Sequence, residues 1–415
     1  MNESSDALTH DWETTGPHRF GAGGPVQLND ETLRDGLQSP SVTDPPAETK
    51  VRLLHFMDAL RIETACVGLP GAGERQRADA ERLCREIADK KLAIRPNCAG
   101  RTLVRDIEPM IDLAQTTGVP VEVCVFIGSS PIRLHTEGWD MARILKHTHD
   151  AVTFAVKEGM DVMYVTEDTV RSSPEHLEQL MTAAVEAGAR RLCICDTVGS
   201  AIPQGVMNLV GWVADLIQRL GVDVGIDWHG HRDRGLAMAN SLAAVQAGAS
   251  RLHGAALGVG ERVGNTPMEQ LLVNLRLLGR RDHDLSALPG YAQAASQALE
   301  VPIPANQPVI GRDAFRTATG VHAAAVVKAR ARGDVGLADA VYSGVPASWL
   351  GREQEIEIGP MSGASNVNYF LEVRGLPHDP EMVQAVLALA KKSQRLLSEA
   401  DVIAIVQQNK KDIVS

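Results

Sequence analysis

Apolar and polar residues follow two periods along most of this chain. From about Val26 to Leu278, short β-prone runs alternate with longer runs whose apolar residues recur at helical spacing, with roughly 25 to 40 residues per pair. This alternation is typical of proteins built on a parallel sheet. It predicts eight strands, at residues 26–28, 62–67, 92–96, 119–126, 161–165, 191–195, 222–227 and 250–255.

Helix start and stop signals lie between these strands. Pro45 and Pro46 precede a helix expected at 48–60, and Gly248 follows one expected at 236–247. Eight strand–helix units favour an α/β fold of the (β/α)8 TIM-barrel type over an open doubly wound sheet. No Gly-x-Gly-x-x-Gly follows the first strand, as a dinucleotide-binding sheet would require.

The alternation divides the chain into four parts. We expect a barrel at 25–282, a linker and subdomain at 283–375, and a helical subdomain at 376–415, so that the barrel carries a smaller, mainly helical C-terminal appendage. Residues 1–24 are polar and lack the basic and apolar segments of a signal peptide, so they are expected to form a disordered leader.

Weaker patterns follow the barrel. In residues 310–328 the apolar residues recur at helical spacing, which predicts a helix. Residues 351–359 alternate between polar and apolar, which predicts one exposed strand. The charged end, 379–414, is expected to be helical.

Composition narrows the possible partners. The 415 residues carry a net charge of -11, which argues against nucleic-acid or anionic-membrane partners and favours small molecules. No run approaches the roughly 20 apolar residues of a membrane span. The six cysteines lack the paired spacing of zinc ribbons, so we interpret them as reduced core residues of a cytoplasmic protein.

A barrel places its active site at the carboxyl ends of its strands. Any single polar residue there is expected to cap a loop or to face solvent, but polar and ionisable residues follow almost every predicted strand. They are Arg34, Asp35, Asn97, Ser129, Ser130, Glu167, Asp168, Asp196, Thr197, His229, His231, Arg232, Asp233, Glu261 and Asn265.

Two histidines at the seventh predicted strand stand out. His229 and His231 are spaced i, i+2, so in an extended segment both side chains point to one side and can reach one metal ion. A strand end whose histidines only donate or accept hydrogen bonds is the alternative that this pair alone leaves open.

Four motifs, in order, carry a resemblance to a known family. They are the runs 29–38 (NDETLRDGLQ), 229–231 (HGH), 258–265 (GVGERVGN) and 319–322 (TGVH). With them the chain resembles the metal-dependent TIM-barrel acyl-CoA condensing enzymes, namely 2-isopropylmalate, homocitrate and citramalate synthases, and more distantly hydroxymethylglutaryl-CoA lyase.

The resemblance implies a divalent metal site. Asp35, His229 and His231 correspond to its protein ligands, with Asn265 as a fourth through its amide oxygen. This mixed nitrogen and oxygen set suits Mg²⁺, Mn²⁺, Zn²⁺ or Co²⁺. Arg34 would place a cation beside the keto oxygen of a bound 2-oxo acid.

The resemblance also implies a catalytic set. His322 corresponds to a histidine that the partner subunit supplies for proton removal from the thioester, while Tyr342 and Glu167 fall where two further catalytic residues lie. Thr197 and Gln38 match substrate-binding positions, although Thr197 could instead cap a turn. The expected assembly is a homodimer.

The expected reaction is the Claisen-type condensation of acetyl-CoA, or another acyl-CoA, with a 2-oxo acid, as in 2-isopropylmalate synthase. Homocitrate or citramalate synthesis, and a homologue from specialised metabolism, are the alternatives within the family. Cleavage of the lyase type is disfavoured because the run 258–264 contains no cysteine, and a non-catalytic metal-binding scaffold is disfavoured because every expected ligand is present. No leucine-regulatory domain is expected after the helical end.

The chain also departs from the family pattern. Arg232 replaces the asparagine that usually follows the second histidine, and Arg234 comes two residues later. These arginines could select a second negative group on the substrate, or form surface ion pairs, which we favour. Ala323 follows His322 where glutamine is usual, and Val165 with Thr166 stray from the serine-containing pattern of isopropylmalate synthases.

Overall fold

The chain divides into two compact units. The structure, a computed structural model, describes residues 8–12, 15 and 24–414, with side chains up to residue 409. Among the described residues, one unit comprises 24–303 and the other comprises 304–414 with 8–12 and 15. Most of the leader expected at 1–24 lies outside the described residues.

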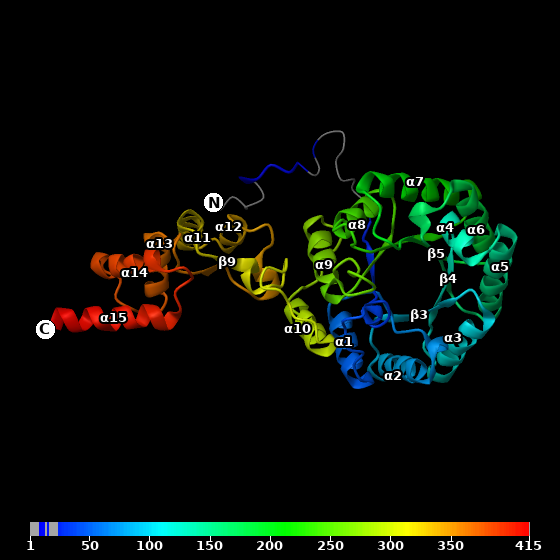
Figure 1. The fold of residues 1–415 in the computed structure, drawn as a ribbon, viewed down its shortest axis with the longest axis horizontal. Helices are drawn as coiled ribbons and strands as arrows, with labels where there is room; N and C mark the ends of the chain where they lie inside the picture. The colour runs from blue at the N-terminus through cyan, green and yellow to red at the C-terminus, as the bar shows by residue number, and fades with distance from the viewer. Residues whose placement is uncertain (1–7, 13–14, 16–23, 415) are drawn as a thin grey trace. The chain divides into compact units, whose positions relative to one another are not determined.

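Eight parallel strands close into a barrel, which confirms the predicted (β/α)8 fold (Figure 1). Each strand pairs with the next along the chain, and β1 pairs with β8 from Gln27↔Arg251 to Asp30↔Gly254. The strands are β1 Gln27–Asp30, β2 Thr64–Cys66, β3 Arg95–Arg101, β4 Glu122–Gly128, β5 Val162–Glu167, β6 Arg191–Asp196, β7 Gly225–Gly230 and β8 Arg251–Gly254.

Helices surround the strands (Figure 1). Some begin at a side-chain cap: Asp140 and Ser173 accept hydrogen bonds from backbone N–H groups in the first turns of the helices that follow them. The helices are α1 Ala47–Ala59, α2 Glu74–Lys90, α3 Val104–Thr117, α4 Pro131–Glu137, α5 Met141–Lys157, α6 Pro174–Glu186, α7 Pro203–Leu220, α8 Ala237–Gln246, α9 Met268–Leu277 and α10 Leu288–Leu299.

Helix α10 belongs to the barrel unit, which therefore continues past residue 282. Its Tyr291 is fully buried and donates a hydrogen bond to Asp30 at the end of β1. The same hydroxyl lies 3.3 Å from Thr32 Oγ1.

Two strands, β3 and β7, continue three or more residues past their predicted ends. The sequence places Asn97 after the third strand, but β3 continues to Arg101, and Asn97 is buried inside the barrel, where it donates to Asn29 Oδ1 at 2.6 Å. The seventh strand lies three residues later than predicted, so His229 is part of β7. In both cases polar residues that point into the barrel interrupt the apolar pattern.

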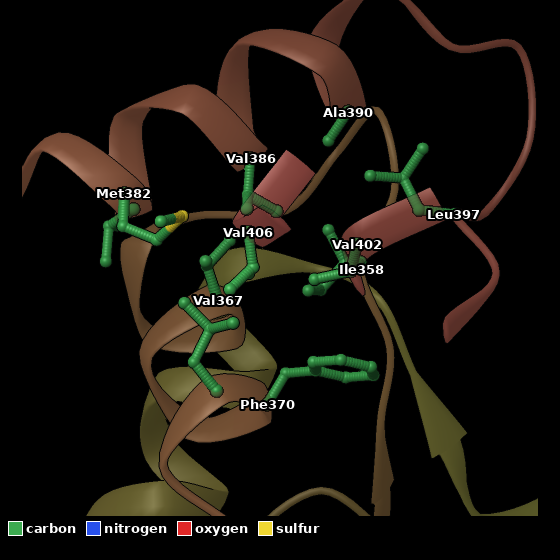
Figure 2. Close-up of a cluster of buried hydrophobic side chains, with 11 residues drawn as sticks. Ile358, Val367, Phe370, Met382, Val386, Ala390, Leu397, Val402 and Val406 are labelled. Carbon is green, nitrogen blue, oxygen red and sulfur yellow. The ribbon is translucent and has the colours of Figure 1, made fainter. Parts of the chain in front are cut away.

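The second unit has a small core of its own. Its elements are β9 Arg316–Thr317, α11 Gly320–Ala331, α12 Val335–Ala340, β10 Glu355–Ile356, α13 Ala364–Glu372, α14 Pro380–Lys392 and α15 Glu399–Val414. Helices α13, α14 and α15 pack around eleven buried residues that include Val367, Phe370 and Val402 (Figure 2). Each such side chain contributes about 1.5–3 kcal/mol when fully buried.

Three expectations for this unit are corrected. The stretch 310–328 is helical only from Gly320, because β9 and a 3₁₀ turn precede α11. The strand expected at 351–359 is two residues long, pairs with β9, and buries Ile356. The helical end is two helices separated at residues 393–398.

Within the part of the chain that the structure describes, no helix has the length and apolarity needed to cross a membrane. All six cysteines are unpaired and buried, as expected.

Candidate metal centre and active site

A cavity of about 250 Å³ opens at the carboxyl ends of the barrel strands. All eight strands, or the loops that follow them, contribute to its wall. Eight of the residues predicted from the sequence line it: Arg34, Asp35, Gln38, Glu167, Thr197, His229, His231 and Glu261.

The expected metal ligands meet at one side of this cavity. His229 Nε2 and His231 Nε2 are 3.2 Å apart, and His231 Nε2 is 3.9 Å from Asp35 Oδ2. One potential ligand atom from each of the three residues lies within 4.8 Å of the others, and all three residues are buried. The i, i+2 spacing therefore does bring both imidazoles to one point, and the loop after β1 brings the carboxylate.

These residues fit a bound divalent ion. Two imidazole nitrogens that bind one ion at about 2.1 Å and about 100° are about 3.2 Å apart, which is the spacing observed here. Asn265 donates from Nδ2 to Asp35 and to the Val259 carbonyl, while its buried Oδ1 has no hydrogen-bond partner. An acceptor buried without a donor is unfavourable, so the amide oxygen is suited to a cation.

Burial and neighbouring charges set the protonation states. Burial lowers the pKa of His229 to about 3, and His231 acts in the same direction. Burial also lowers the pKa of His231. For Asp35, burial alone would raise the pKa, but neighbouring groups, Arg34 first among them, outweigh burial and hold the pKa below its usual range. Neutral imidazoles beside an ionised carboxylate are the forms that bind metals.

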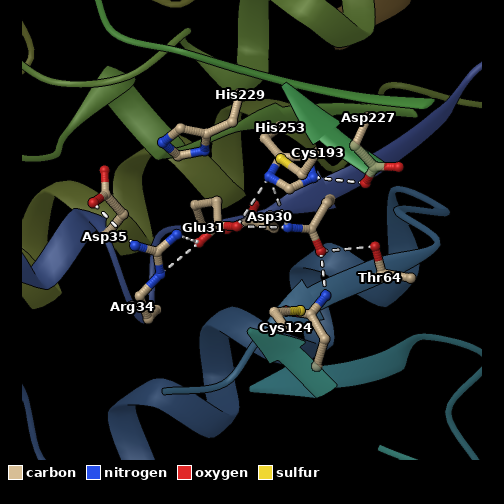
Figure 3. A network of polar contacts seen from close by, with 12 residues as sticks. Asp30, Glu31, Arg34, Asp35, Thr64, Cys124, Cys193, Asp227, His229 and His253 are labelled. Atoms are coloured by element: carbon tan, nitrogen blue, oxygen red, sulfur yellow. Dashed lines mark hydrogen bonds and ion pairs between the residues drawn. The ribbon is translucent and has the colours of Figure 1, made fainter. Parts of the chain in front are cut away.

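Arg34 lies between two carboxylates (Figure 3). Its Nη2 is 2.6 Å from Glu31 Oε2 and its Nη1 is 3.2 Å from Asp35 Oδ1. The guanidinium is thereby fixed at the edge of the metal centre with its side chain facing the cavity.

Sequence reasoning missed a buried charge network beneath this site (Figure 3). His253 Nδ1 lies 3.1 Å from Glu31 Oε1, and His253 Nε2 lies 2.8 Å from Asp227 Oδ2. Burial would lower the pKa of His253, but the hydrogen bonds to Asp227 and Glu31 raise it above its ordinary value. The sequence does carry one indication of this network: Arg251 and His253 are two residues apart in the eighth strand, so both side chains point into the barrel.

Glu31, His229 and His253 also form a group close enough to hold an ion. Glu31 and His253, however, are occupied by each other, by Arg34 and by Asp227. We therefore assign this group to the ion-pair network, which leaves Asp35, His229 and His231 as the candidate metal centre.

Glu167 and Thr197 border the cavity mouth. Glu167 pairs with Arg133 at 3.1 Å; burial raises the pKa of Glu167, and Arg133 partly offsets that rise. Thr197 Oγ1 accepts a hydrogen bond from the Asp168 N–H at 2.8 Å, which joins the loop after β6 to the loop after β5 and is not a cap within its own turn. Its hydroxyl proton can still be donated to a ligand.

His322 and Tyr342 lie in the other compact unit. Their rings stack with centroids 4.0 Å apart and planes at 25°, and both side chains are exposed. The two residues expected to complete the site are thus neighbours of each other.

The glycine-rich loop and the extra arginines have structural roles. Gly258, Gly260 and Gly264 have φ angles of +64°, +153° and +106°, and a Cβ on Gly260 would lie 2.2 Å from Asn265 Nδ2. Arg232 and Arg234 donate to the backbone carbonyls of Val263 and Ser200. Neither arginine lines the cavity, and these hydrogen bonds are to backbone carbonyls, not to the carboxylates of the expected surface ion pairs.

A family model described as HMGL-like matches residues 25–293. The chain belongs to the HMGL-like family. Homocitrate synthase AksA of Methanopyrus kandleri is 31% identical over 88% of this chain and 87% of its own length. The putative (R)-citramalate synthase CimA of the same organism is 30% identical over 92% of this chain and 72% of its own length. The 2-isopropylmalate synthase of Sulfolobus acidocaldarius is 29% identical over 93% of this chain and 96% of its own length. The resemblance inferred from the four motifs is confirmed.

Solved HMGL-like structures share the fold. HMG-CoA lyase of Brucella melitensis matches 66% of this chain and 99% of its own with a TM-score of 0.54 at 16% identity. Hydroxymethylglutaryl-CoA lyase of Pseudomonas aeruginosa matches 66% of this chain and 92% of its own, with a TM-score of 0.55 at 20% identity. At these sequence identities the similarity shows the fold alone. It therefore does not indicate whether the reaction is a condensation or a cleavage.

Proposed function

We propose that the protein is an acyltransferase that condenses an acyl-CoA, acetyl-CoA in the first instance, with a 2-oxo acid to give a 2-hydroxy dicarboxylic acid and free CoA. The observation that carries the proposal is the cluster of Asp35, His229 and His231 beside Arg34 at the cavity mouth. Relatives named as synthases support condensation, and 2-isopropylmalate synthesis is the specific form we favour over homocitrate or citramalate synthesis.

Asp35, His229, His231 and the Asn265 amide oxygen would hold Mg²⁺, Mn²⁺, Zn²⁺ or Co²⁺. When bound there, such an ion acts as a Lewis acid toward the keto oxygen of the 2-oxo acid.

Arg34 and Thr197 position the substrate in this proposal. The Arg34 guanidinium faces the same point as the metal ligands, so it stabilises negative charge that develops on the former keto oxygen. The Thr197 hydroxyl donates to the substrate carboxylate, and Gln38 and Glu167 border the same opening. The Glu167 carboxyl, whose pKa burial raises, can return a proton to the new alkoxide.

The remaining step needs a carbon nucleophile. A base, His322 with Tyr342 beside it, removes a proton from the thioester methyl group, and the resulting carbanion forms a C–C bond to the keto carbon as the C=O π bond breaks. Water then cleaves the thioester, leaving a carboxylate and CoA thiol. We propose that residues 283–375 of one subunit supply His322 and Tyr342 to the barrel of its partner in a homodimer.

Release of CoA thiol from acetyl-CoA tests the reaction. We expect release only when a 2-oxo acid and Mg²⁺ or Mn²⁺ are both present, loss after EDTA, and recovery when metal is restored. Product mass identifies the acid that reacts. If no 2-oxo acid in the panel produces CoA and no metal binds, the protein is a scaffold and the proposal fails.

Mixing two inactive variants tests the shared site. In His229→Ala only the barrel part of the site is damaged. In His322→Ala only the part that the partner subunit supplies is damaged. In randomly exchanged dimers half of the molecules are hybrids with one intact site, so about a quarter of wild-type activity should return. Activity that stays absent after verified subunit exchange would contradict donation between subunits.

A further inference from the structure

The interior of the barrel has a charged side and an apolar side. Strands β7, β8 and β1 with the loop after β1 provide most of the charged or titratable groups that line the cavity, and Glu167 and Glu261 add two carboxyl groups at its mouth. The groups from β7, β8 and β1 are His229, His231, His253, Glu31, Arg34 and Asp35. Strands β2 to β6 provide a continuous wall of sulfur and hydrocarbon, which we call the sulfur wall: Cys66, Ala99, Cys124, Phe126, Met163, Val165, Cys193 and Cys195.

Strand register produces the sulfur wall. On β6, Cys193 and Cys195 point inward at i and i+2, with their Sγ atoms 3.9 Å apart, and Thr197 is the next residue in the same series. On β5, Met163 and Val165 are followed by Glu167 in the same way. The polar residues therefore stand at the mouth, above apolar residues.

The nearby cations are already paired with carboxylates. Arg34 lies between Glu31 and Asp35, and Arg133 pairs with Glu167 and with Glu137 at 3.2 Å. Among the described residues that form the sulfur wall, none carries a positive charge.

His253 is likewise held by Glu31 and Asp227, and Arg251 is a further cation close to this wall. Its Nη2 is 3.2 Å from Met163 Sδ, and it is held by Asp227 and by Glu122 at 2.8 Å. It does not line the cavity. Its Nη1 is buried without a hydrogen-bond partner, but because Arg251 lies outside the described cavity lining, a second carboxylate of the substrate would meet an apolar wall there.

We propose that the sulfur wall receives the substituent of the 2-oxo acid and restricts the enzyme to monocarboxylic 2-oxo acids with an uncharged hydrocarbon chain. This inference rests on the proposed condensation. It follows because a buried carboxylate without a partner is strongly unfavourable, whereas a methyl or methylene group gains from burial. Cys124, Val165 and Cys195 are the residues that we expect to set the size of the substituent.

Two acids of equal length test the charge restriction. 2-Oxopentanoate and 2-oxoglutarate differ in one terminal group, a methyl against a carboxylate. We expect kcat/KM for 2-oxoglutarate to be lower by about a thousandfold. Equal or better use of 2-oxoglutarate would overturn the inference while leaving condensation intact.

The same pair remains informative if condensation itself fails. Calorimetric binding of each acid to the Mn²⁺-loaded protein then compares the two directly. Tighter binding of 2-oxopentanoate supports the sulfur wall as the substituent site, and tighter binding of 2-oxoglutarate, or binding of neither acid, refutes it.

Substitutions in the wall test its location. In Cys195→Leu and Cys124→Leu, kcat/KM for 2-oxopentanoate relative to the shortest accepted 2-oxo acid should fall at least about tenfold. This ratio is independent of the fraction of folded enzyme, because both acids are measured on one preparation. An unchanged ratio in both variants would show that the substituent binds elsewhere.

Two further variants separate shape from thiol chemistry. Cys98 is buried on β3 but does not line the cavity, so Cys98→Leu is the matched control and should keep the wild-type ratio. Cys195→Ala enlarges the cavity at the wall, so kcat/KM for longer chains should rise relative to the shortest accepted 2-oxo acid. Complete loss of condensation in a folded, metal-binding Cys195→Ala protein would mean that the thiol takes part in the reaction, and the wall interpretation would be wrong.

Discussion

Replacing Gly260 by alanine should disable the metal centre without unfolding the barrel. The added Cβ would lie 2.2 Å from Asn265 Nδ2 and 3.0 Å from Asp35 Oδ2, whereas ordinary contacts begin near 3.4 Å. The Asn265 amide must therefore move by about 1.2 Å, which breaks its hydrogen bonds to Asp35 and to the Val259 carbonyl. Two proposed ligands lose their positions together.

The expected size of the effect follows from these contacts. Two lost hydrogen bonds contribute about 0.5–1.5 kcal/mol each, and the φ of +153° adds about 1 kcal/mol of backbone strain for a residue with a Cβ. Urea unfolding in EDTA should report a loss of about 2–4 kcal/mol in total. Displacing groups that position metal ligands typically weakens metal affinity by about 10–100-fold, which Mn²⁺ calorimetry measures.

Gly118→Ala is the matched control. Gly118 has φ of +69° at the end of α3, but nothing lies within 4 Å of the added Cβ. This variant carries the backbone strain without the collision, so it should lose about 1 kcal/mol of stability and bind Mn²⁺ normally. If Gly260→Ala also bound Mn²⁺ like wild type, Asp35 and Asn265 could not be holding the ion in the arrangement described.

Three other substitutions test separate parts of the structure. His229→Ala should abolish Mn²⁺-dependent CoA release yet shift the melting temperature little, since the imidazole lies at the barrel mouth; release that persists would exclude His229 as a ligand. His322→Ala should bind the 2-oxo acid as wild type does but stop condensation, and an unchanged rate would remove His322 from the mechanism. Burial raises the pKa of Asp30 to about 6 from an ordinary 3.8. The protonated carboxyl therefore contributes fully to the free energy of unfolding below pH 3.8, and this contribution is lost as the pH rises through 6. Relative to wild type, Asp30→Asn should therefore gain about 3 kcal/mol in unfolding free energy between about pH 3.5 and pH 7, measured in urea, and a pH-independent difference would contradict the buried ionisation.

The barrel could be predicted from the sequence because its signal is periodic and local. Eight apolar runs at regular intervals leave few alternatives to a closed parallel sheet. The errors occurred where strands carry polar residues into the interior, as at Asn97 in β3 and His229 in β7. There the functional demand of the cavity overrides the apolar pattern on which strand prediction depends.

The candidate site was predictable only as far as its motifs extend. Asp35, His229 and His231 were found because each lies in a short recognisable run, and the structure brings them together. Glu31 and His253 were missed because they are 222 residues apart, and nothing local indicates that the two will pair. The cysteines were correctly expected to be buried, but burial alone does not reveal that four of them face a cavity.

Charge balance links the buried network to the metal centre. Arg34 pairs with both Glu31 and Asp35, and His253 pairs with both Glu31 and Asp227. Glu31 therefore has two cationic partners, whereas Asp35 has only Arg34, which it shares with Glu31. The other oxygen of Asp35 faces the Asn265 amide and two imidazoles whose pKa values burial lowers. Neutral histidines cannot balance a buried carboxylate. Asp35 is therefore the carboxylate of this network that most needs a further cation, and it lies beside the unsatisfied oxygen of Asn265.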